Sequence, residues 1–273
     1  MFVVRTAGSI TEVNSAQHRW HRAIYARDLL RELVSRDMKL RYKRSVLGIV
    51  WSLINPLAQL LVFYFVFGVL LPLHVSHYSS FLFTGVLVWS WFQSSLLSAT
   101  GAIVDNRELI KRPGFPVAIL PTVSVTSHLV HFLLAVPILL GCILLDVGRL
   151  SGAIVAMPLM IAIQFIFTLS LSYLIATFHV TFRDTQYLLG VLLQLFFFLT
   201  PVFYDIAAIP ERHRSLLRLN PMVHLVEGYR AILIHGKLPD QTSLLVLAVC
   251  STVLLLIGSL VFKRASYRFV EEL

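Results

Sequence analysis

Residues 46–71 read VLGIVWSLINPLAQLLVFYFVFGVLL and contain no Asp, Glu, Lys or Arg. A run of this kind is long enough to cross a bilayer as a helix, because each residue adds about 1.5 Å and the hydrocarbon core is about 30 Å thick. The same rule, applied outward along the chain, predicts further spans that bring the expected total to six. They lie at residues 80–104, 117–145, 152–178, 187–203 and 243–262.

The composition of the whole chain is typical of a protein whose solvent is lipid. Of its 273 residues, 57% are hydrophobic and 14% are charged, whereas a soluble domain carries about 25% charged residues. The net charge of +9 comes mostly from basic residues beside the apolar runs, where anionic lipids attract them. Nucleic acid binding is therefore not expected. Cys142 and Cys250 lie inside apolar runs without a metal-binding or disulfide pattern.

The distribution of Lys and Arg predicts the orientation of the chain. Most of the 23 basic residues lie before the first span, between the second and third spans, or after the last one. Because the cytoplasmic side holds the excess of basic residues, both termini are expected in the cytoplasm. The expected organisation is a cytoplasmic N-terminal region (1–45), one membrane-spanning domain (46–262) and a cytoplasmic tail (263–273), retained whole because no cleavable signal is evident.

The first 45 residues predict a helix that lies on the membrane surface. One face is apolar and the opposite face is charged. The apolar face carries Ala23, Ala26, Leu30, Leu33 and Val34, and the charged face carries Asp28, Glu32, Arg36 and Lys39. Such a helix fits a simple membrane anchor, and it equally fits a collar that also contacts a cytoplasmic partner.

The segment between the second and third spans, residues 105–116, reads DNRELIKRPGFP. Asp105 is a favourable helix cap, and Pro113 followed by Gly114 stops a helix. A short charged helix is therefore predicted between two spans. It is either a tight solvated connection or an element that docks on another subunit, and we favour docking.

The segment before the last span, residues 200–240, is moderately apolar but is interrupted by Pro201, Pro210 and Pro221. Asn220 and Pro221 predict a helix start, and that helix ends no later than about His235. Its length of about 22 Å is too short to cross a bilayer. We expect short re-entrant helices, buried in protein or lining a wet cavity, with an ordinary outer loop as the alternative.

Several chemical motifs are missing from the sequence. There is no phosphate-binding GxxxxGK[ST] loop, no HExxH and no GxSxG, so the chain is predicted to be no enzyme and to hold no cofactor. His128 and His131 form a close pair without an acidic third ligand, and no metal site is expected. Charges are nearly absent from the middle of the spans, which disfavours an ion-coupled carrier. A passive channel remains an alternative function at this point.

Three stretches resemble one known family at matching places. They are RDMKLRYKRSVLGIVWSLINP at 36–56, RELIKRPGFP at 107–116 and LNPMVHLVEGYR at 219–230. The sequence is similar, over nearly its whole length, to permease subunits of ABC transporters that export polysaccharide such as O-antigen, capsule or teichoic acid. The resemblance implies a permease domain at 46–262 in the inner membrane of a bacterial cell. It also implies a homodimer of six-span subunits that works with two separate ATP-binding subunits, which hold ATP and Mg.

The resemblance also implies roles for two groups of residues. The N-terminal helix and the first intracellular loop would receive the ATP-binding subunits, with coupling residues Asp105, Arg107, Glu108, Lys111 and Arg112. The short helices at 204–240 would form an outer gate, with Pro210, Asn220, Pro221, Glu227 and Arg230.

The expected cargo, a lipid-linked glycan, suggests two more sites. Sugar faces rest well on aromatic rings, so a conduit is predicted along Phe63, Tyr64, Phe67, Phe196, Phe197 and Tyr204. A lipid diphosphate needs cationic partners at the cytoplasmic mouth, where Arg41, Lys43 and Arg44 are candidates or, equally, topology anchors.

Two other functions remain as alternatives at the level of the sequence. A related ABC permease could export a drug, haem or a lipid. A membrane enzyme of glycolipid synthesis would need clustered acidic or histidine residues at the membrane surface, whereas Asp105, Asp184 and Asp205 are dispersed along the chain.

Overall fold

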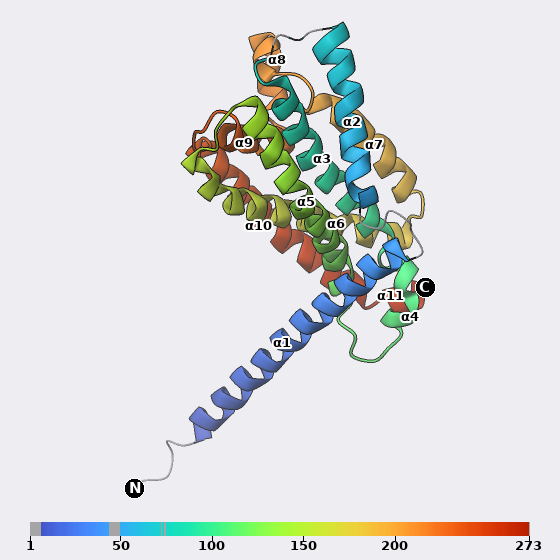
Figure 1. The fold of residues 1–273 in the computed structure, drawn as a ribbon. Helices are drawn as coiled ribbons and strands as arrows, with labels where there is room; N and C mark the ends of the chain where they lie inside the picture. Colours follow the sequence, from blue (N-terminus) through green and yellow to red (C-terminus); the bar gives the residue numbers. More distant parts are fainter. Residues whose placement is uncertain (1–6, 44–49, 72, 74, 273) are drawn as a thin grey trace.

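We describe the protein from a computed structural model that covers residues 7–43, 50–71, 73 and 75–272. Helices make up most of these residues. The helix α1, Ala7–Tyr42, runs far out from the rest of the molecule and meets it beside α4 and α11 (Figure 1). A helix within the first 45 residues is thus confirmed, whereas Arg44 and the start of the predicted first span lie outside the described residues.

The remaining long helices form one bundle. Within the described residues, five helices are long and apolar enough to cross a membrane. They are α2, Trp51–Tyr64, which continues as the π-helix Phe65–Leu70; α3, Tyr78–Gly101; α5, Ile119–Asp146; α6, Met157–Thr181, which follows the 3-10 turn Gly152–Ala156; and α10, Gln241–Ser266. These five match five of the six apolar runs predicted from the sequence.

The predicted span at 187–203 corresponds to a shorter helix. Helix α7, Thr185–Leu199, has 15 residues, fewer than a perpendicular crossing of the bilayer requires. It ends because Thr200 adopts an extended conformation with φ −101° and ψ 133°, as is usual for a residue before proline. Pro201 and Val202 then turn back into the bundle, where both are buried.

Helix α3 is the centre of the bundle. It packs mainly against α5 and α6, and α6 in turn packs along α10. Gln164 of α6 is fully buried, and its amide donates a hydrogen bond of 2.9 Å to the carbonyl oxygen of Val88 in α3. Gly258 allows α10 to approach α6, because a methyl group there would lie 2.8 Å from the carbonyl oxygen of Ser170. Small residues serve this purpose widely between membrane helices.

Helices α2 and α7 have the opposite character. Only 6% of the apolar stretch of α2 is buried, compared with 78% for α3. In α7, Leu189 and Leu193 are the buried residues among those described. Large apolar side chains such as Leu61 and Phe65 of α2 and Leu195 of α7 are more than half exposed. The subunit therefore leaves a broad apolar surface along these two helices.

One end of the bundle, here called the α4 end, carries short elements. They are the 3-10 turn Val104–Asn106, α4, Arg107–Ile110, and α11, Phe269–Glu272. A second apolar cluster, which includes Leu33, Ile110, Phe262 and Phe269, joins them to α1, α5, α6 and α10. From the apolar face predicted for α1, Leu30, Leu33 and Val34 pack against this cluster.

The opposite end of the bundle carries α8, Glu211–Leu217, and α9, Pro221–Leu233 (Figure 1). The predicted start of α9 is confirmed, since the side chain of Asn220 accepts a hydrogen bond of 3.0 Å from the backbone N–H of Met222. The chain leaves α9 before Gly236, which has a positive φ of 64°. Helix α9 therefore has the short length that the sequence predicts.

Candidate functional site

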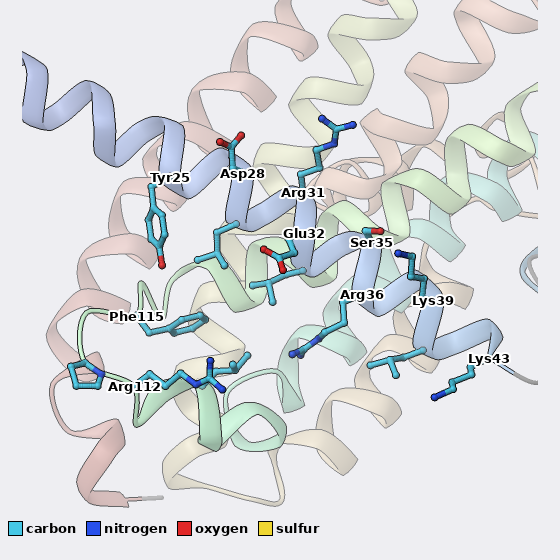
Figure 2. Close-up of a pocket in the computed structure, with 15 residues that line it drawn as sticks. Tyr25, Asp28, Arg31, Glu32, Ser35, Arg36, Lys39, Lys43, Arg112 and Phe115 are labelled. Carbon is cyan, nitrogen blue, oxygen red and sulfur yellow. The ribbon is translucent and has the colours of Figure 1, made fainter.

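A groove lies at the α4 end, between α1 and the loop that follows α4. It has a volume of about 1100 Å³ and is lined by Leu109, Arg112, Pro113 and Phe115 together with one side of α1, from Tyr25 to Leu40, and Lys43. In Figure 2, Glu32 and Arg36 point from α1 toward the loop that carries Arg112 and Phe115. Basic side chains outnumber acidic ones in its lining, so the groove favours an acidic or mixed-charge partner surface.

The five predicted coupling residues lie in α4 or next to it and have exposed side chains: Asp105, Arg107, Glu108, Lys111 and Arg112. Of these, Arg112 lines the groove itself, and Lys111 and Arg112 line a neighbouring pocket of about 660 Å³. The apolar residues Leu109, Ile110 and Phe115 pack in the second apolar cluster or against it. The loop is thus fixed by its apolar side and presents its charges outward.

The predicted helix in this loop differs in detail from the one observed. Asp105 was expected to cap it, but α4 begins at Arg107 after Asn106 and comprises a single turn. Asn106 is held differently, because its side-chain oxygen accepts a hydrogen bond of 3.1 Å from Arg36 of α1. Sequence reasoning missed this contact, which joins residues 70 positions apart.

An aromatic cluster joins α2 to α7 and to the segment after α7. The ring of Phe203 stacks on Phe63 and Phe67, with centroid distances of 5.7 and 5.1 Å, and lies 6.0 Å from Phe197. Phe197 also contacts Phe63 at 5.7 Å and Trp89 of α3 at 5.8 Å. Three predicted conduit residues, Phe63, Phe67 and Phe197, therefore meet, and Phe203 is the member that the predicted set omitted.

The other predicted conduit residues lie at the edge of this cluster or away from it. Tyr64 is 45% exposed and stacks on Tyr78 at 6.3 Å. Phe196 is equally exposed. Tyr204 contacts the ring of Phe203 at 5.0 Å, and its hydroxyl donates a hydrogen bond of 3.0 Å to the carbonyl oxygen of Phe198.

Arg230, predicted as a gate residue, is buried in the packing and is only 3% exposed. Its guanidinium donates hydrogen bonds to the carbonyl oxygens of Pro201 at 2.6 Å, of Val202 at 2.7 Å and of Phe81 at 3.2 Å. It also lies 3.3 Å from the ring centroid of Phe81. Arg230 thus clamps α9 to the start of α3 and to the end of α7. Gly85 is part of this clamp, since a methyl group there would lie 2.7 Å from the carbonyl oxygen of Val202.

The other predicted gate residues occupy helix starts or a small pocket. Pro210 precedes α8, and Asn220 and Pro221 begin α9. Glu227 is half-buried and lines a pocket of about 220 Å³ together with His224 and Asp240. Asp240 itself caps α10, because its carboxylate accepts a hydrogen bond of 2.8 Å from the backbone N–H of Ser243. This hydrogen bond holds the pKa of Asp240 below its ordinary value.

A second polar link at this end was not predicted. The carboxylate of Asp146, at the end of α5, accepts hydrogen bonds from the Ser79 hydroxyl at 2.6 Å and from the Ser80 hydroxyl and N–H at 2.8 and 3.1 Å. His77 lies 3.3 Å from its other oxygen. Asp146 therefore serves the unpaired N–H groups at the start of α3 as a cap supplied by another helix.

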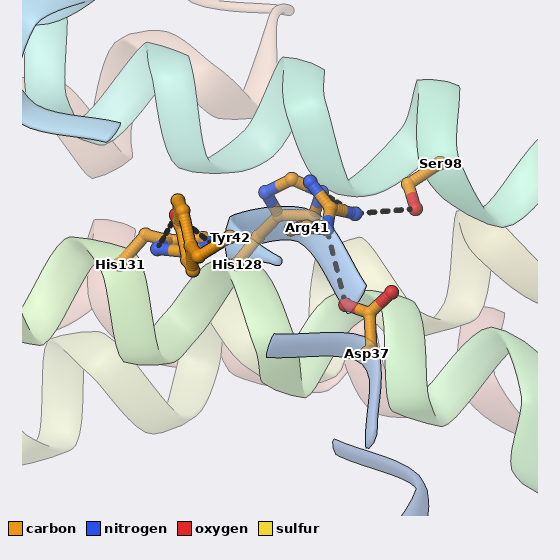
Figure 3. Close-up of polar contacts among 6 residues, drawn as sticks. All are labelled: Asp37, Arg41, Tyr42, Ser98, His128 and His131. Atoms are coloured by element: carbon orange, nitrogen blue, oxygen red, sulfur yellow. Dashed lines mark hydrogen bonds and ion pairs between the residues drawn. The ribbon is translucent and has the colours of Figure 1, made fainter. Parts of the chain in front are cut away.

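Two of the three residues predicted to bind a lipid diphosphate, Arg41 and Lys43, lie within the described part of the chain. Arg41 lies at the end of α1, where its Nε donates to Asp37 at 3.1 Å and its Nη2 lies 3.3 Å from both Ser98 and His128 (Figure 3). Lys43 is exposed and lines the end of the groove. Arg44 falls outside the described residues.

Comparison with known proteins places this architecture in a family. Residues 28–234 match the family model for the ABC-2 type transporter. The chain is 39% identical over 249 residues to an O-antigen export system permease protein RfbA of Myxococcus xanthus, covering 90% of this chain and 96% of that protein. It is 30% identical to the protein of the same name in Klebsiella pneumoniae (91% and 96%), and 28% identical to the polysialic acid transport protein KpsM of Escherichia coli (88% and 92%). The chain belongs to the ABC-2 type transporter family.

Proposed function

We propose that this chain is the permease subunit of an ABC exporter that moves a lipid-linked polysaccharide across the bacterial inner membrane. The observation that carries the proposal is its likeness, over nine tenths of its length, to permeases named for O-antigen export and to a transport protein named for polysialic acid. A drug, haem or simple lipid cargo receives no such support. The chain acts as a conduit and makes no covalent change in its cargo.

The proposed topology has six spans with both termini in the cytoplasm. In it, α7 is the fifth span, extended across the bilayer by the segment around Pro201 and Val202. Helices α8 and α9, within residues 204–240, are re-entrant gate helices at the outer face. The α4 end is cytoplasmic, because the charged loop 105–116 lies there. The proposed cytoplasmic regions at the termini are 1–45 and 263–273, and the permease domain is 46–262.

The working unit is proposed to be a homodimer. Helices α2 and α7 leave large apolar side chains exposed on the same subunit, and a second copy of this chain offers a matching surface. Because the aromatic cluster of Phe63, Phe67, Phe197 and Phe203 joins α2 to α7, its two copies would come to lie near the dimer axis. Aromatic rings there supply apolar faces on which sugar rings slide.

Energy is proposed to come from two ATP-binding subunits that hold ATP and Mg and dock at the α4 end. The groove between α1 and the loop supplies the shape, and exposed Arg107, Glu108, Lys111 and Arg112 supply the charge. Movement of the docked subunits reaches the spans through α4, because Ile110 is anchored in the apolar cluster that also holds α1 and α10.

Charge reversal tests the docking surface. We expect the triple variant Arg107→Glu, Lys111→Glu, Arg112→Glu to lose co-purification with the ATP-binding subunit and to lose surface glycan in a strain that lacks the native permease. Exposed charges contribute little to folding, so the variant should insert and dimerise normally.

A matched control reverses three exposed basic residues at the other end of the bundle, Arg212, Arg218 and Lys237. This control should keep the complex intact. Wild-type complex formation and wild-type export by the first triple variant would refute the docking assignment. A wild-type chain that restores no surface glycan would refute the polysaccharide assignment.

A further inference from the structure

A pocket of about 380 Å³ lies where the end of α1 meets the beginning of α2 and the middle of α3 and α5. Its size falls in the range of about 300–1,000 Å³ typical of small-ligand sites. The polar residues in its lining that matter here are Arg41, Tyr42, Asn55, Trp91, His128 and His131. Each can donate a hydrogen bond. Among the described residues that line the pocket, none is acidic.

The cation of the pocket is held in a fixed position. Asp37 binds the Nε of Arg41 at 3.1 Å from outside the lining, and the Nη2 lies 3.3 Å from the Nε2 of His128 (Figure 3). Arginine has five N–H groups and cannot accept, so His128 accepts here through Nε2 and carries its proton on Nδ1. Asp37 therefore orients the guanidinium while other N–H groups stay available to a ligand.

Tyr42 stands beside this cation. Its hydroxyl lies 3.2 Å from the Nδ1 of His131, and the two rings meet edge to face at 5.8 Å (Figure 3). His131 follows His128 by one turn of α5, and their ring centroids are 5.7 Å apart. Arg41 and Tyr42, which are neighbours in α1, thus each contact one histidine of α5.

Trp91 supplies an independent indication that the pocket takes a ligand. The side chain is 3% exposed and lines the pocket, yet its indole N–H has no acceptor among the described residues. Trp89 on the same helix, by contrast, donates to Gln93 at 2.8 Å. Buried donors are normally paired, so an acceptor brought by a ligand would complete the site.

The ligand chemistry follows from these donors. A phosphate group offers only acceptors and negative charge, and it binds arginine through charge-assisted hydrogen bonds. The rim of the pocket includes the exposed residues Trp51 and Asn55 at the start of α2, the helix whose apolar stretch is only 6% buried in the subunit. A lipid tail attached to the phosphate can therefore remain in an apolar environment.

We propose that this pocket binds the phosphate groups of the lipid that carries the exported glycan. Arg41 makes the ionic contact, and Tyr42 and Trp91 donate neutral hydrogen bonds. The inference rests on the proposed function. It assigns phosphate binding to one defined pocket and not to a general attraction by the basic residues at 41–44. Residues of α3 and α5, far from that run in sequence, complete the pocket.

Binding of farnesyl diphosphate to the purified complex of permease and ATP-binding subunit tests the proposal by calorimetry, with farnesol and inorganic diphosphate as comparison probes. We expect Arg41→Gln to weaken binding of farnesyl diphosphate by at least about tenfold, as for loss of a charged hydrogen bond. Trp91→Phe and Tyr42→Phe, which keep the rings, should each weaken it several-fold. Tyr173→Phe is the matched control, because its hydroxyl bonds Ala118 and Thr122 outside the pocket.

Melting temperatures of the three test variants near that of wild type establish that the fold is intact, and Trp91→Phe alone suffices for the test if Arg41→Gln unfolds. Unchanged binding in Trp91→Phe and Tyr42→Phe would overturn the proposal. Equal affinity for farnesol would show that no phosphate is recognised, and equal affinity for inorganic diphosphate would assign the pocket to a soluble anion; either result overturns it.

Glycan export by the same variants in cells separates this proposal from the proposed function. Wild-type export together with unaltered binding in the variants would reject the pocket and leave the function standing. Loss of binding in the variants, with a wild-type chain that restores no surface glycan, would support the pocket and reject the function.

Discussion

Replacement of Arg230 tests the clamp that holds α9. In Arg230→Met the carbonyl oxygens of Pro201 and Val202, which lie outside helices, lose donors at 2.6 and 2.7 Å. Each unsatisfied buried acceptor costs about 1–3 kcal/mol. The carbonyl of Phe81 keeps the helical donor of α3, and the lost contact with the Phe81 ring is offset by removing a buried charge. We therefore expect a net loss of about 3 kcal/mol.

Thermal unfolding of the purified protein in detergent measures this effect. A loss of about 3 kcal/mol lowers the melting temperature of a chain of this size by roughly 6–12 °C. Arg230→Lys should be intermediate, since a single ammonium cannot span the three carbonyls as a planar guanidinium does. Arg214→Met is the control: Arg214 also binds two carbonyl oxygens, at 2.6 and 2.7 Å, but is only half-buried. An Arg230→Met protein with the same melting temperature as wild type would refute the clamp.

Three further predictions concern packing and caps. Gly85→Ala should lower the melting temperature, because its methyl group would lie 2.7 Å from a backbone carbonyl oxygen. Gly141→Ala should not, because nothing lies within 4 Å of its added methyl group. Equal melting temperatures of the two variants would contradict this prediction. Asp146→Ala should cost about 1–3 kcal/mol through the unpaired donors of α3, and a neutral result in the same assay would reject the cap. The hydrogen bond from Ser243 lowers the pKa of Asp240, so the stabilisation by its carboxylate is present above the ordinary pKa and is lost as pH falls through the lowered one. The melting temperatures of wild type and Asp240→Asn should therefore differ at neutral pH and converge in acid. A difference that stays constant with pH would refute the assignment.

The long spans could be predicted from the sequence because lipid imposes a simple rule of length and polarity. Runs such as 80–104 and 243–262 satisfy it without reference to any other part of the chain. The start of α9 could also be predicted from neighbouring residues alone, since Asn220 and Pro221 act on adjacent backbone groups. The predicted run 187–203 passes the end of helix α7 because Val202 and Phe203 are apolar, although the conformation of Thr200 before proline ends the helix at Leu199.

Contacts between distant residues could not be predicted in this way. Arg230 carries a charge in a short amphipathic helix, which suggests an exposed position, yet it binds the carbonyl of Phe81 across 149 residues. Asp146 ends an apolar run and resembles a boundary residue, but it accepts a hydrogen bond from Ser80 in the first turn of α3, 66 residues earlier. Phe203 was one aromatic residue among many. Nothing in its local sequence distinguishes it from Phe196, which is 45% exposed.

The two ends of the bundle are held by different interactions, and this difference bears on which end receives a partner. At the α8 and α9 end, buried Arg230 and half-buried Asp146 depend on defined donor and acceptor positions, so small displacements leave their hydrogen bonds unsatisfied. At the α4 end, apolar side chains such as Ile110 and Phe269 provide the attachment, while the charged side chains remain exposed. Apolar contacts are non-directional and tolerate sliding. A subunit that docks on those charges can therefore move α4 without breaking the interactions that fix the opposite end.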